Sequence, residues 1–309
     1  MGAAALRAIF LWLAHRRWMA RLAMGTPLVR RVAFRFVAGT TLDQAAVAAR
    51  ALNESGISAT LDVLGESVTE RSTAERAAAA YVASLDRIAA DGLDANVSVK
   101  LTQMGLDLST DTCTDVLRPV LEVARRHGIF VRIDMESSAH TDRTLEVVRQ
   151  LRAEGFDIGP VIQSYLHRSA ADLAPFAGGR VRVRICKGAY DEPESIAWHH
   201  RAQINRSFVE LCTTLLEADA YPGIGTHDPE MIDAVRRVAE ERGVPKDRFE
   251  FQLLYGIRRD LQRQLVADGY RVRVYVPYGT EWYPYFMRRL AERPENVRFL
   301  LRSVFGERS

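Results

Sequence analysis

Cysteine is scarce in this chain: only three occur among 309 residues, at positions 113, 186 and 212. They form no CxxC pair and no Cys/His pattern with the spacing of metal ligands. Neither a disulfide framework nor a structural zinc site is therefore indicated. The cysteine content instead predicts a protein of a reducing compartment, the cytoplasm, with no metal centre.

Lysine is equally rare, with three residues against 39 arginines. Two of the three, Lys100 and Lys187, end runs of residues that are typical of strands. An ammonium group is more compact and more strongly hydrated than a guanidinium group. A chain that otherwise uses arginine therefore has a reason to keep lysine where a site needs a point charge, although chance is the alternative on so few residues.

Acidic residues are absent before Asp43, while seven arginines occupy that stretch. Its apolar run from Ala8 to Ala14 is too short to span a bilayer, and most of the positive charge follows the run, unlike the order in a secretory signal. We expect basic amphipathic helices here and treat residues 1–57 as a helical arm. Three alternatives stay open: peripheral contact with an anionic membrane surface, packing on the rest of the protein or on a neighbouring subunit, and an Arg-rich transit peptide.

The rest of the composition is that of a globular protein. The chain is 48% hydrophobic and 26% charged, so it can bury a large core, and its length suits a single barrel. Its formal net charge is only +3, which argues against nucleic-acid binding by the whole surface.

From Asp43 onward, short β-branched runs alternate with helical patterns that end at glycine or before proline. The eight predicted strands are residues 58–64, 96–101, 129–135, 160–166, 181–187, 222–227, 249–254 and 272–277. Eight strands separated by helices predict a parallel (β/α)8 barrel over residues 58–309.

Polar residues close every one of these strands. Active sites of such barrels lie at the carboxyl ends of the strands, so these residues are the candidates for function. They are Asp62, Lys100, Asp134, Gln163, Arg184, Lys187, Thr226, His227, Gln252 and Tyr275. Polar groups at all eight strand ends predict a site large enough for a cofactor.

The helix predicted after the last strand carries an aromatic cluster followed by two adjacent arginines. Tyr285, Arg288, Arg289 and Glu292 are spaced at i, i+3, i+4 and i+7, which places them on one helical face. An aromatic ring beside two planar cations matches a small ring or chain that ends in a carboxylate. Glu292, or Glu66 from the barrel, would hold the guanidinium groups when the site is empty.

Seven segments in order along the strand ends resemble the proline dehydrogenase family. They are SVKLTQMGL (98–106), RIDME (132–136), VIQSYLHRS (161–169), RVRICKGAYDEP (182–193), GTHD (225–228), FEFQLLYGI (249–257) and YVPYGTEWYPYFMRRLAE (275–292). The resemblance runs from about residue 58 to the end of the chain. It implies a barrel that binds FAD, oxidises L-proline to Δ1-pyrroline-5-carboxylate by hydride transfer to flavin N5, and passes the electrons to a membrane quinone. The chain has no room for the aldehyde dehydrogenase module of the bifunctional relatives, so we expect a monofunctional enzyme.

The resemblance also implies roles for individual residues. Lys100, Asp134 and Arg184 are the implied catalytic residues. The implied substrate contacts are Lys100, Tyr275, Tyr285, Arg288 and Arg289, with both arginines on the proline carboxylate. The implied flavin contacts are Met135, Gln163, Arg184, Lys187, Gly188, Ala189, Thr226 and His227. Glu66 is implied to pair with Arg289 as a gate.

Other functions remain open at this point. A lyase or isomerase barrel for a phosphorylated substrate would use Lys100 and Lys187, and a non-enzymatic anion-binding or membrane-associated module would use the basic arm. Within the resemblance, hydroxyproline is the alternative substrate, but relatives selective for it tend to carry a smaller residue at Tyr275. The oligomeric state, and any role of His167 or of Asp228 where bifunctional relatives commonly have Asn, also stay open.

Overall fold

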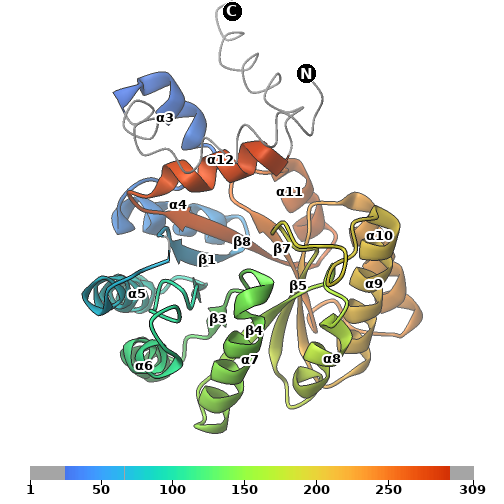
Figure 1. Ribbon diagram of the computed structural model, residues 1–309. Coiled ribbons are helices and arrows are strands. Elements are labelled where there is room, and N and C mark those ends of the chain that lie inside the picture. The colour runs from blue at the N-terminus through green and yellow to red at the C-terminus, as the bar shows by residue number, and fades with distance from the viewer. Residues whose placement is uncertain (1–24, 66, 293–309) are drawn as a thin grey trace, which may run out of the picture.

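Each short β-branched run of the sequence forms a strand, and each strand is followed by a helix, as the alternation predicts. The computed structural model, which describes residues 25–65 and 67–292, closes the strands into one parallel barrel in chain order (Figure 1). The strands are β1 (Ser58–Val63), β2 (Ala95–Val99), β3 (Val131–Ile133), β4 (Ile158–Gln163), β5 (Arg182–Cys186), β6 (Tyr221–Gly225), β7 (Glu250–Leu254) and β8 (Arg271–Tyr278). The predicted (β/α)8 fold is confirmed.

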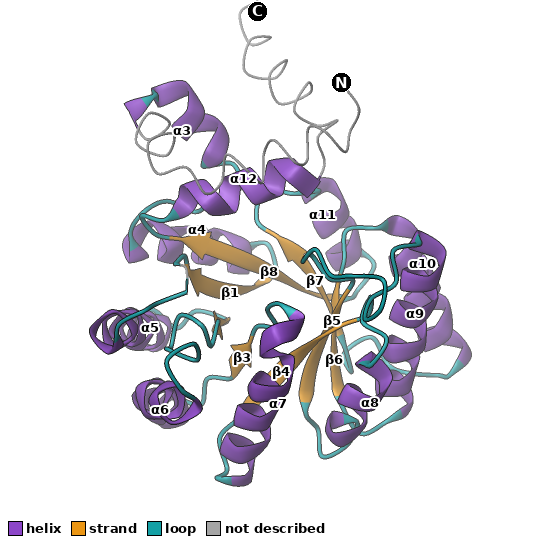
Figure 2. Cartoon of the chain, in the orientation of Figure 1, coloured by secondary structure: helices purple, strands orange, loops and turns teal. Residues whose placement is uncertain are grey.

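The helices between the strands surround the barrel (Figure 2). They are α5 (Arg71–Ala90), α6 (Thr110–His127), α7 (Ser138–Ala153), α8 (Ser169–Leu173) with the 3-10 turn η1 (Ala174–Phe176), α9 (Arg201–Glu217), α10 (Pro229–Glu241) and α11 (Arg259–Ala267). Local sequence sets their ends. At α6, the Ser109 side chain accepts a hydrogen bond from the Thr112 backbone N–H, and Gly128 ends the helix at a φ of 67° that glycine adopts without strain.

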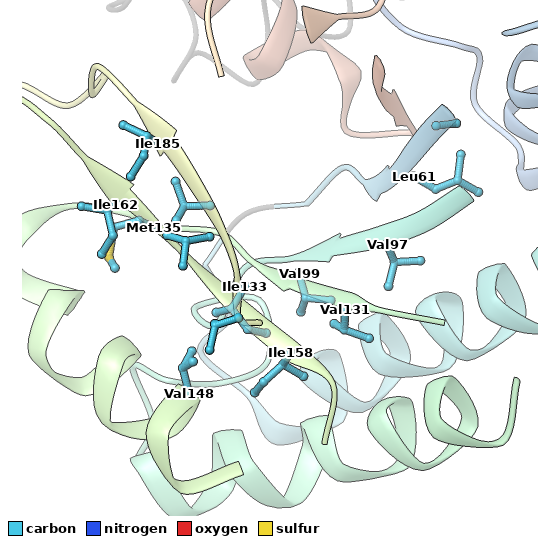
Figure 3. Packing of buried hydrophobic residues seen from close by; sticks show 14 of the residues in the cluster. Leu61, Val97, Val99, Val131, Ile133, Met135, Val148, Ile158, Ile162 and Ile185 are labelled. Atoms are coloured by element: carbon cyan, nitrogen blue, oxygen red, sulfur yellow. The ribbon is translucent and has the colours of Figure 1, made fainter. Parts of the chain in front are cut away.

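Apolar side chains fill the space between the strands and the helices. All six residues of β4 are buried, because helices cover the outer face of a parallel barrel while side chains fill its interior. Figure 3 shows part of this core, including Val97, Val131 and Ile158, each 0% exposed. This packing holds the strands in register and therefore fixes the positions of the polar residues at their ends.

Two helices depart from the regular alternation of one strand and one outer helix. Helix α4 (Leu42–Glu54) comes before β1 and packs against both β1 and β8 through Ala45, Ala46 and Ala49. Helix α12 (Trp282–Glu292), which follows β8, instead packs with α3 (Pro27–Ala33), beside α12 in Figure 1. A separate apolar cluster joins these two helices. Thus α4 covers the outside of the barrel next to β8, while α12 is held at its rim.

The chain between α3 and α4 is built into this rim. The Ala38 backbone N–H donates to the Pro277 carbonyl at 2.9 Å, and the Gly279 N–H donates to the Gly39 carbonyl at 3.1 Å. Val37 is fully buried in the cluster that holds α12. This part of the predicted arm therefore packs on the barrel, whereas residues 1–24 of the arm lie outside the described residues.

Within the ranges that the structure describes, no helix combines the length and the apolar character that a membrane crossing requires.

Candidate active site

A cluster of charged side chains lies at the carboxyl ends of β1, β2, β3 and β8. Lys100 Nζ donates to Asp62 Oδ1 at 2.9 Å and to Tyr275 Oη at 3.2 Å, and lies 3.5 Å from Asp134 Oδ2. Tyr275 Oη donates in turn to Asp134 Oδ2 at 2.8 Å. Residues from four strands therefore form one hydrogen-bonded network.

The network sets the protonation states of Lys100, Asp134 and Tyr275. Burial lowers the pKa of Lys100, but Asp62 and Asp134 outweigh it and hold this pKa above its ordinary value. Burial raises the pKa of Asp134, and Lys100 with Arg184 outweigh it in the opposite direction. Burial, then the charge of Asp134, holds the pKa of Tyr275 well above its usual range. Around neutral pH, Lys100 therefore stays protonated, Asp134 stays ionised and the Tyr275 phenol stays neutral.

Arg184, in β5, binds the second oxygen of the same carboxylate. Its Nη1 donates to Asp134 Oδ1 at 2.8 Å, and Ser98 Oγ donates to that oxygen at 2.5 Å. Its Nε donates to Gln252 Oε1. The guanidinium lies 5.4 Å from the centre of the Tyr275 ring. Arg184 is thus a nearly buried cation, with 11% of its side chain exposed, held from several strands.

The ends of β3 and β4 are joined through a buried amide. Gln163 is 3% exposed, and its Nε2 donates to the Glu136 carbonyl at 2.8 Å. The Glu136 carboxylate accepts from the Thr102 backbone N–H at 3.0 Å and from its hydroxyl at 2.6 Å. Met135 is 8% exposed and belongs to the hydrophobic core (Figure 3). This chain of contacts fixes the segment that follows β3.

The segment after β5 faces the start of α10. Lys187 Nζ lies 2.7 Å from Asp228 Oδ2, and the Asp228 side chain also caps α10. Gly188 has a φ of 108°, and a Cβ there would lie 2.2 Å from Tyr165 Cδ1, so a larger residue would collide with that ring. Ala189 is exposed. A cation and a tight glycine turn therefore stand together at the end of β5.

Strand β6 is followed by a hydroxyl and an imidazole. Thr226 is 7% exposed, and its Oγ1 accepts from the Asp228 backbone N–H at 3.1 Å. His227 Nε2 accepts from the Leu254 backbone N–H at 2.8 Å. This bond leaves the ring proton of the neutral imidazole on Nδ1, which makes that nitrogen the donor.

Helix α12 carries the predicted aromatic and cationic face. The Arg289 guanidinium lies 5.1 Å from the centre of the Tyr285 ring, as the i, i+4 spacing predicts. Arg288 and Arg289 are both partly exposed, whereas Tyr285 is 6% exposed. The predicted partners, Glu66 and the side chain of Glu292, lie outside the described part of the chain.

Eight of the predicted site residues thus fall into three sets. Lys100, Asp134, Arg184 and Tyr275 share one network; Lys187 and Thr226 meet at Asp228; Tyr285 and Arg289 stack on α12. Gln163 and His227 bind backbone groups instead.

Comparison with known proteins shows which family the chain belongs to. Residues 45–302 match the family model described as proline dehydrogenase. The chain is 40% identical to proline dehydrogenase 1 of Bacillus subtilis subsp. natto, over 97% of this chain and 99% of that protein. It is also 40% identical to the proline dehydrogenase of Deinococcus radiodurans, over 88% of this chain and 90% of that protein. The chain belongs to the proline dehydrogenase family.

Longer proteins contain a region of the same family and fold. Proline utilization A from Bdellovibrio bacteriovorus, solved after inactivation by N-propargylglycine, matches with a TM-score of 0.81 and 27% identity, over 91% of this chain and 34% of that one. The bifunctional protein PutA of Escherichia coli (strain K12) is 29% identical over 90% of this chain and 25% of that protein. The proline dehydrogenase fold therefore corresponds to one region of these longer chains.

Some residues of this hydrogen-bonded cluster were not predicted. Ser98 contacts Asp134, and Glu250 contacts the Gln252 amide. The sequence could have indicated both, because alternate residues of a strand lie on the same face. Ser98 shares a strand face with Lys100, and Glu250 shares one with Gln252.

Tyr190, in the segment after β5, was also missed. It is 40% exposed, yet surrounding protein and the Glu136 charge raise the pKa of its phenol to about 12, while Lys100 and Arg288 act in the opposite direction. Charges from the barrel network and from α12 thus both act on the Tyr190 phenol. Its position directly after the KGA turn at the end of β5 could have indicated it from the sequence.

The arrangement suits binding and orientation more than covalent catalysis. Cations from the barrel and from α12 offer charge to an anionic ligand. The Cys186 thiol is a poor nucleophile, because burial raises its pKa to about 11 although the charge of Arg184 acts in the opposite direction.

Proposed function

We propose that this protein oxidises L-proline to Δ1-pyrroline-5-carboxylate, with FAD as its cofactor and a membrane quinone as the final electron acceptor. The observation that carries this proposal is the network of Lys100, Asp134, Arg184 and Tyr275 at the strand ends. Lys100 and the nearly buried Arg184 share one ionised carboxylate there, so the network holds fixed charges at the strand ends without a change of protonation.

The donor groups at the ends of β4, β5 and β6 fit an anionic dinucleotide. Lys187 supplies a point charge, the Nδ1–H of His227 is a donor, and Gly188 allows a tight turn of the backbone. No GxGxxG motif follows the first strand, so a Rossmann turn does not hold the nucleotide. The residues proposed to hold FAD are Met135, Gln163, Arg184, Lys187, Gly188, Ala189, Thr226 and His227.

Proline is proposed to lie between this network and α12. Arg288 and Arg289 would bind its carboxylate, because planar guanidinium groups match the two oxygens of a carboxylate. Tyr275 and Tyr285 would pack against its apolar ring, and Lys100 would face it from the barrel. Glu66 would pair with Arg289, and this ion pair would act as a gate to the proline site.

FAD, when bound, supplies the capacity to accept a hydride from the carbon next to the ring nitrogen. The protein's own groups orient the substrate and compensate charge. Arg184 and Lys100 keep positive charge beside the carboxylate of Asp134, and this charge favours the reduced, more anionic state of a cofactor bound nearby. No side chain has to act as a nucleophile.

A purified sample tests the proposal directly. We expect it to be yellow, to release FAD on acid denaturation, and to oxidise L-proline with an artificial electron acceptor. A colourless protein that does not turn over proline would contradict the proposal and favour a lyase or isomerase for a phosphorylated substrate.

Substrate selectivity is tested in the same assay. The Tyr275 hydroxyl is bonded to both Lys100 and Asp134, so it has a fixed position in the site. We propose that this hydroxyl leaves no room for a 4-hydroxyl group on the ring. The ratio of kcat/KM should therefore favour L-proline over trans-4-hydroxy-L-proline, and the reverse preference would assign the hydroxyproline activity.

We also propose a cytoplasmic protein that reaches quinone at the inner face of the cell membrane through the basic arm. Self-association into a homo-oligomer is a further proposal, and no nucleic-acid partner is expected. The arm is the natural candidate for membrane contact because residues 1–24 carry four arginines and no acid.

A further inference from the structure

A second layer of buried polar residues lies next to Arg184 on β7 and β8. Arg273 Nε donates to Glu250 Oε1 at 2.8 Å, and Gln252 Nε2 donates to the same oxygen at 2.5 Å. The Gln252 carbonyl oxygen, Oε1, accepts from Arg184 Nε. Glu250 is 5% exposed and Gln252 is 7% exposed. A continuous series of bonds therefore leads from Arg273 to Arg184.

The carboxylate of Glu250 determines which way the Gln252 amide points. Burial raises the pKa of Glu250, but Arg273 outweighs it and lowers this pKa, so the group stays an ionised acceptor. A carboxylate cannot donate, so the amide NH2 of Gln252 has to face it. The amide carbonyl then faces Arg184. With the amide reversed, NH2 would meet the guanidinium, and two donors would oppose each other without an acceptor.

The Gln252 amide fits beside β6 because a glycine of that strand has no side chain there. A Cβ at Gly223, in β6, would lie 2.5 Å from Gln252 Nε2. On its other side, Arg184 is bound to Asp134 through Nη1 at 2.8 Å. The guanidinium is thus held at Nε by Gln252 and at Nη1 by Asp134, and these two bonds determine where its charge lies.

We propose that Gln252, with its amide oriented by Glu250 and Arg273, is a positioning residue for Arg184. This inference rests on the proposed function, which assigns Arg184 to the flavin side of the site. Gln252 acts through Arg184 and not on substrate, so its loss should affect the redox step more than the binding of proline.

The test compares two holoenzyme variants with wild type. Gln252→Met keeps the length of the side chain but removes the acceptor for Arg184. Thr60→Val is the matched control, because it also removes one buried hydrogen bond inside the barrel, from Thr60 Oγ1 to Asn96 Oδ1 at 2.6 Å, but one that does not reach Arg184. The readouts are kcat, KM for proline, and the reduction potential of the bound flavin.

For Gln252→Met we expect kcat to fall about tenfold or more while KM for proline changes less than about threefold. The flavin potential should become more negative by about 30 mV for each tenfold change in the relative binding of its two redox states. Thr60→Val should leave all three values unchanged. If Gln252→Met behaves like Thr60→Val, the positioning role is wrong.

The double variant Glu250→Gln with Gln252→Glu decides the case in which Gln252→Met does not retain flavin. It exchanges the amide and the carboxylate, so a donor still stands between the two side chains, an oxygen acceptor still faces Arg184 and the net charge is unchanged; kcat should therefore stay within about threefold of wild type if acceptor position is what matters. A drop above tenfold with normal flavin content would overturn the inference. A wild-type protein without flavin or without proline turnover would instead contradict the proposed function, so the two failures are distinguishable.

Discussion

Lys100 lies between two carboxylates, and its charge is compensated before any ligand arrives. The nearly buried Arg184 shares one of these carboxylates, Asp134, so the pair of cations and the pair of acids balance. Removing one member would leave a buried charge without its partner, which is costly. The site therefore acts as one unit at the residue scale, and single substitutions within it should have large effects.

The pH dependence of the reaction should come from the substrate. The raised pKa values of Lys100 and Tyr275 keep both groups protonated above neutral pH, and the lowered pKa of Asp134 keeps it ionised below neutral pH. None of the three changes charge across the neutral range, whereas the proline amine must lose its proton to donate electron density. We expect kcat/KM to rise with pH.

A less basic substrate checks this assignment. With thiazolidine-4-carboxylate, whose amine is less basic than that of proline, the pH profile of kcat/KM should shift to lower pH. Profiles that coincide for the two substrates would mean that an enzyme group titrates instead.

The arginines of α12 should control substrate affinity. We expect Arg288→Ala or Arg289→Ala to retain flavin but to raise KM for proline ten- to a hundredfold, because a charge-assisted bond to a carboxylate contributes about 1.5 to 3 kcal/mol. Steady-state kinetics with an artificial acceptor measures this. Arg125→Ala is the matched control, since Arg125 also lies over a ring, 4.6 Å from the centre of Phe156, on the outside of the barrel. Loss of flavin without a change in KM would contradict the assignment.

At the scale of elements, the first turn of α10 links the helix to the proposed cofactor site. Asp228 caps α10 and also pairs with Lys187. We expect Lys187→Ala to reduce flavin retention more than proline affinity, measured by flavin content after gel filtration and by KM. Asp228→Asn should preserve the cap, because Asn and Asp cap helices about equally well, and should not weaken flavin binding. If Asp228→Asn loses flavin as readily as Lys187→Ala, the pair itself holds the cofactor site.

Helices α3 and α12 form one structural unit at this same scale. Ala33 and Val37 are fully buried against α12 through the cluster that contains Trp282 and Phe286. Because Arg288 and Arg289 belong to α12, the position of the proposed substrate residues depends on a segment near the start of the chain.

At the scale of the whole molecule, the basic arm has two roles to be separated. One is membrane contact by residues 1–24, and the other is packing of the segment that follows them against α12. If residues 1–24 contact an anionic membrane, their deletion should abolish cosedimentation with anionic vesicles while turnover of proline with a soluble dye persists. Binding by the intact protein should weaken with salt, since the Debye length falls from about 30 Å at 0.01 M to about 10 Å at 0.1 M.

Deletion of residues 1–39 is the contrasting variant. It also removes Ala33 and Val37, so it should lose proline turnover as well as vesicle binding. If the intact protein ignores vesicles at every salt concentration, the membrane role of the arm is wrong, and packing remains as its function.

The sequence by itself determined the eight strands, because each is a short run rich in β-branched and apolar residues between helical patterns, and it determined the polar residues at their ends. It also predicted the stacking of Arg289 on Tyr285, since a spacing of four residues is a local property of a helix. These features depend on periodicities within a short stretch of chain.

Only the tertiary structure decided which distant residues meet. Arg184 and Gln252 are 68 residues apart, and Lys187 and Asp228 are 41 apart. The pattern that places a side chain on the inner face of a strand does not say which partner it will bind across the barrel. The place of α4 was likewise undetermined, because an amphipathic helix shows that one face is buried but not which surface covers it.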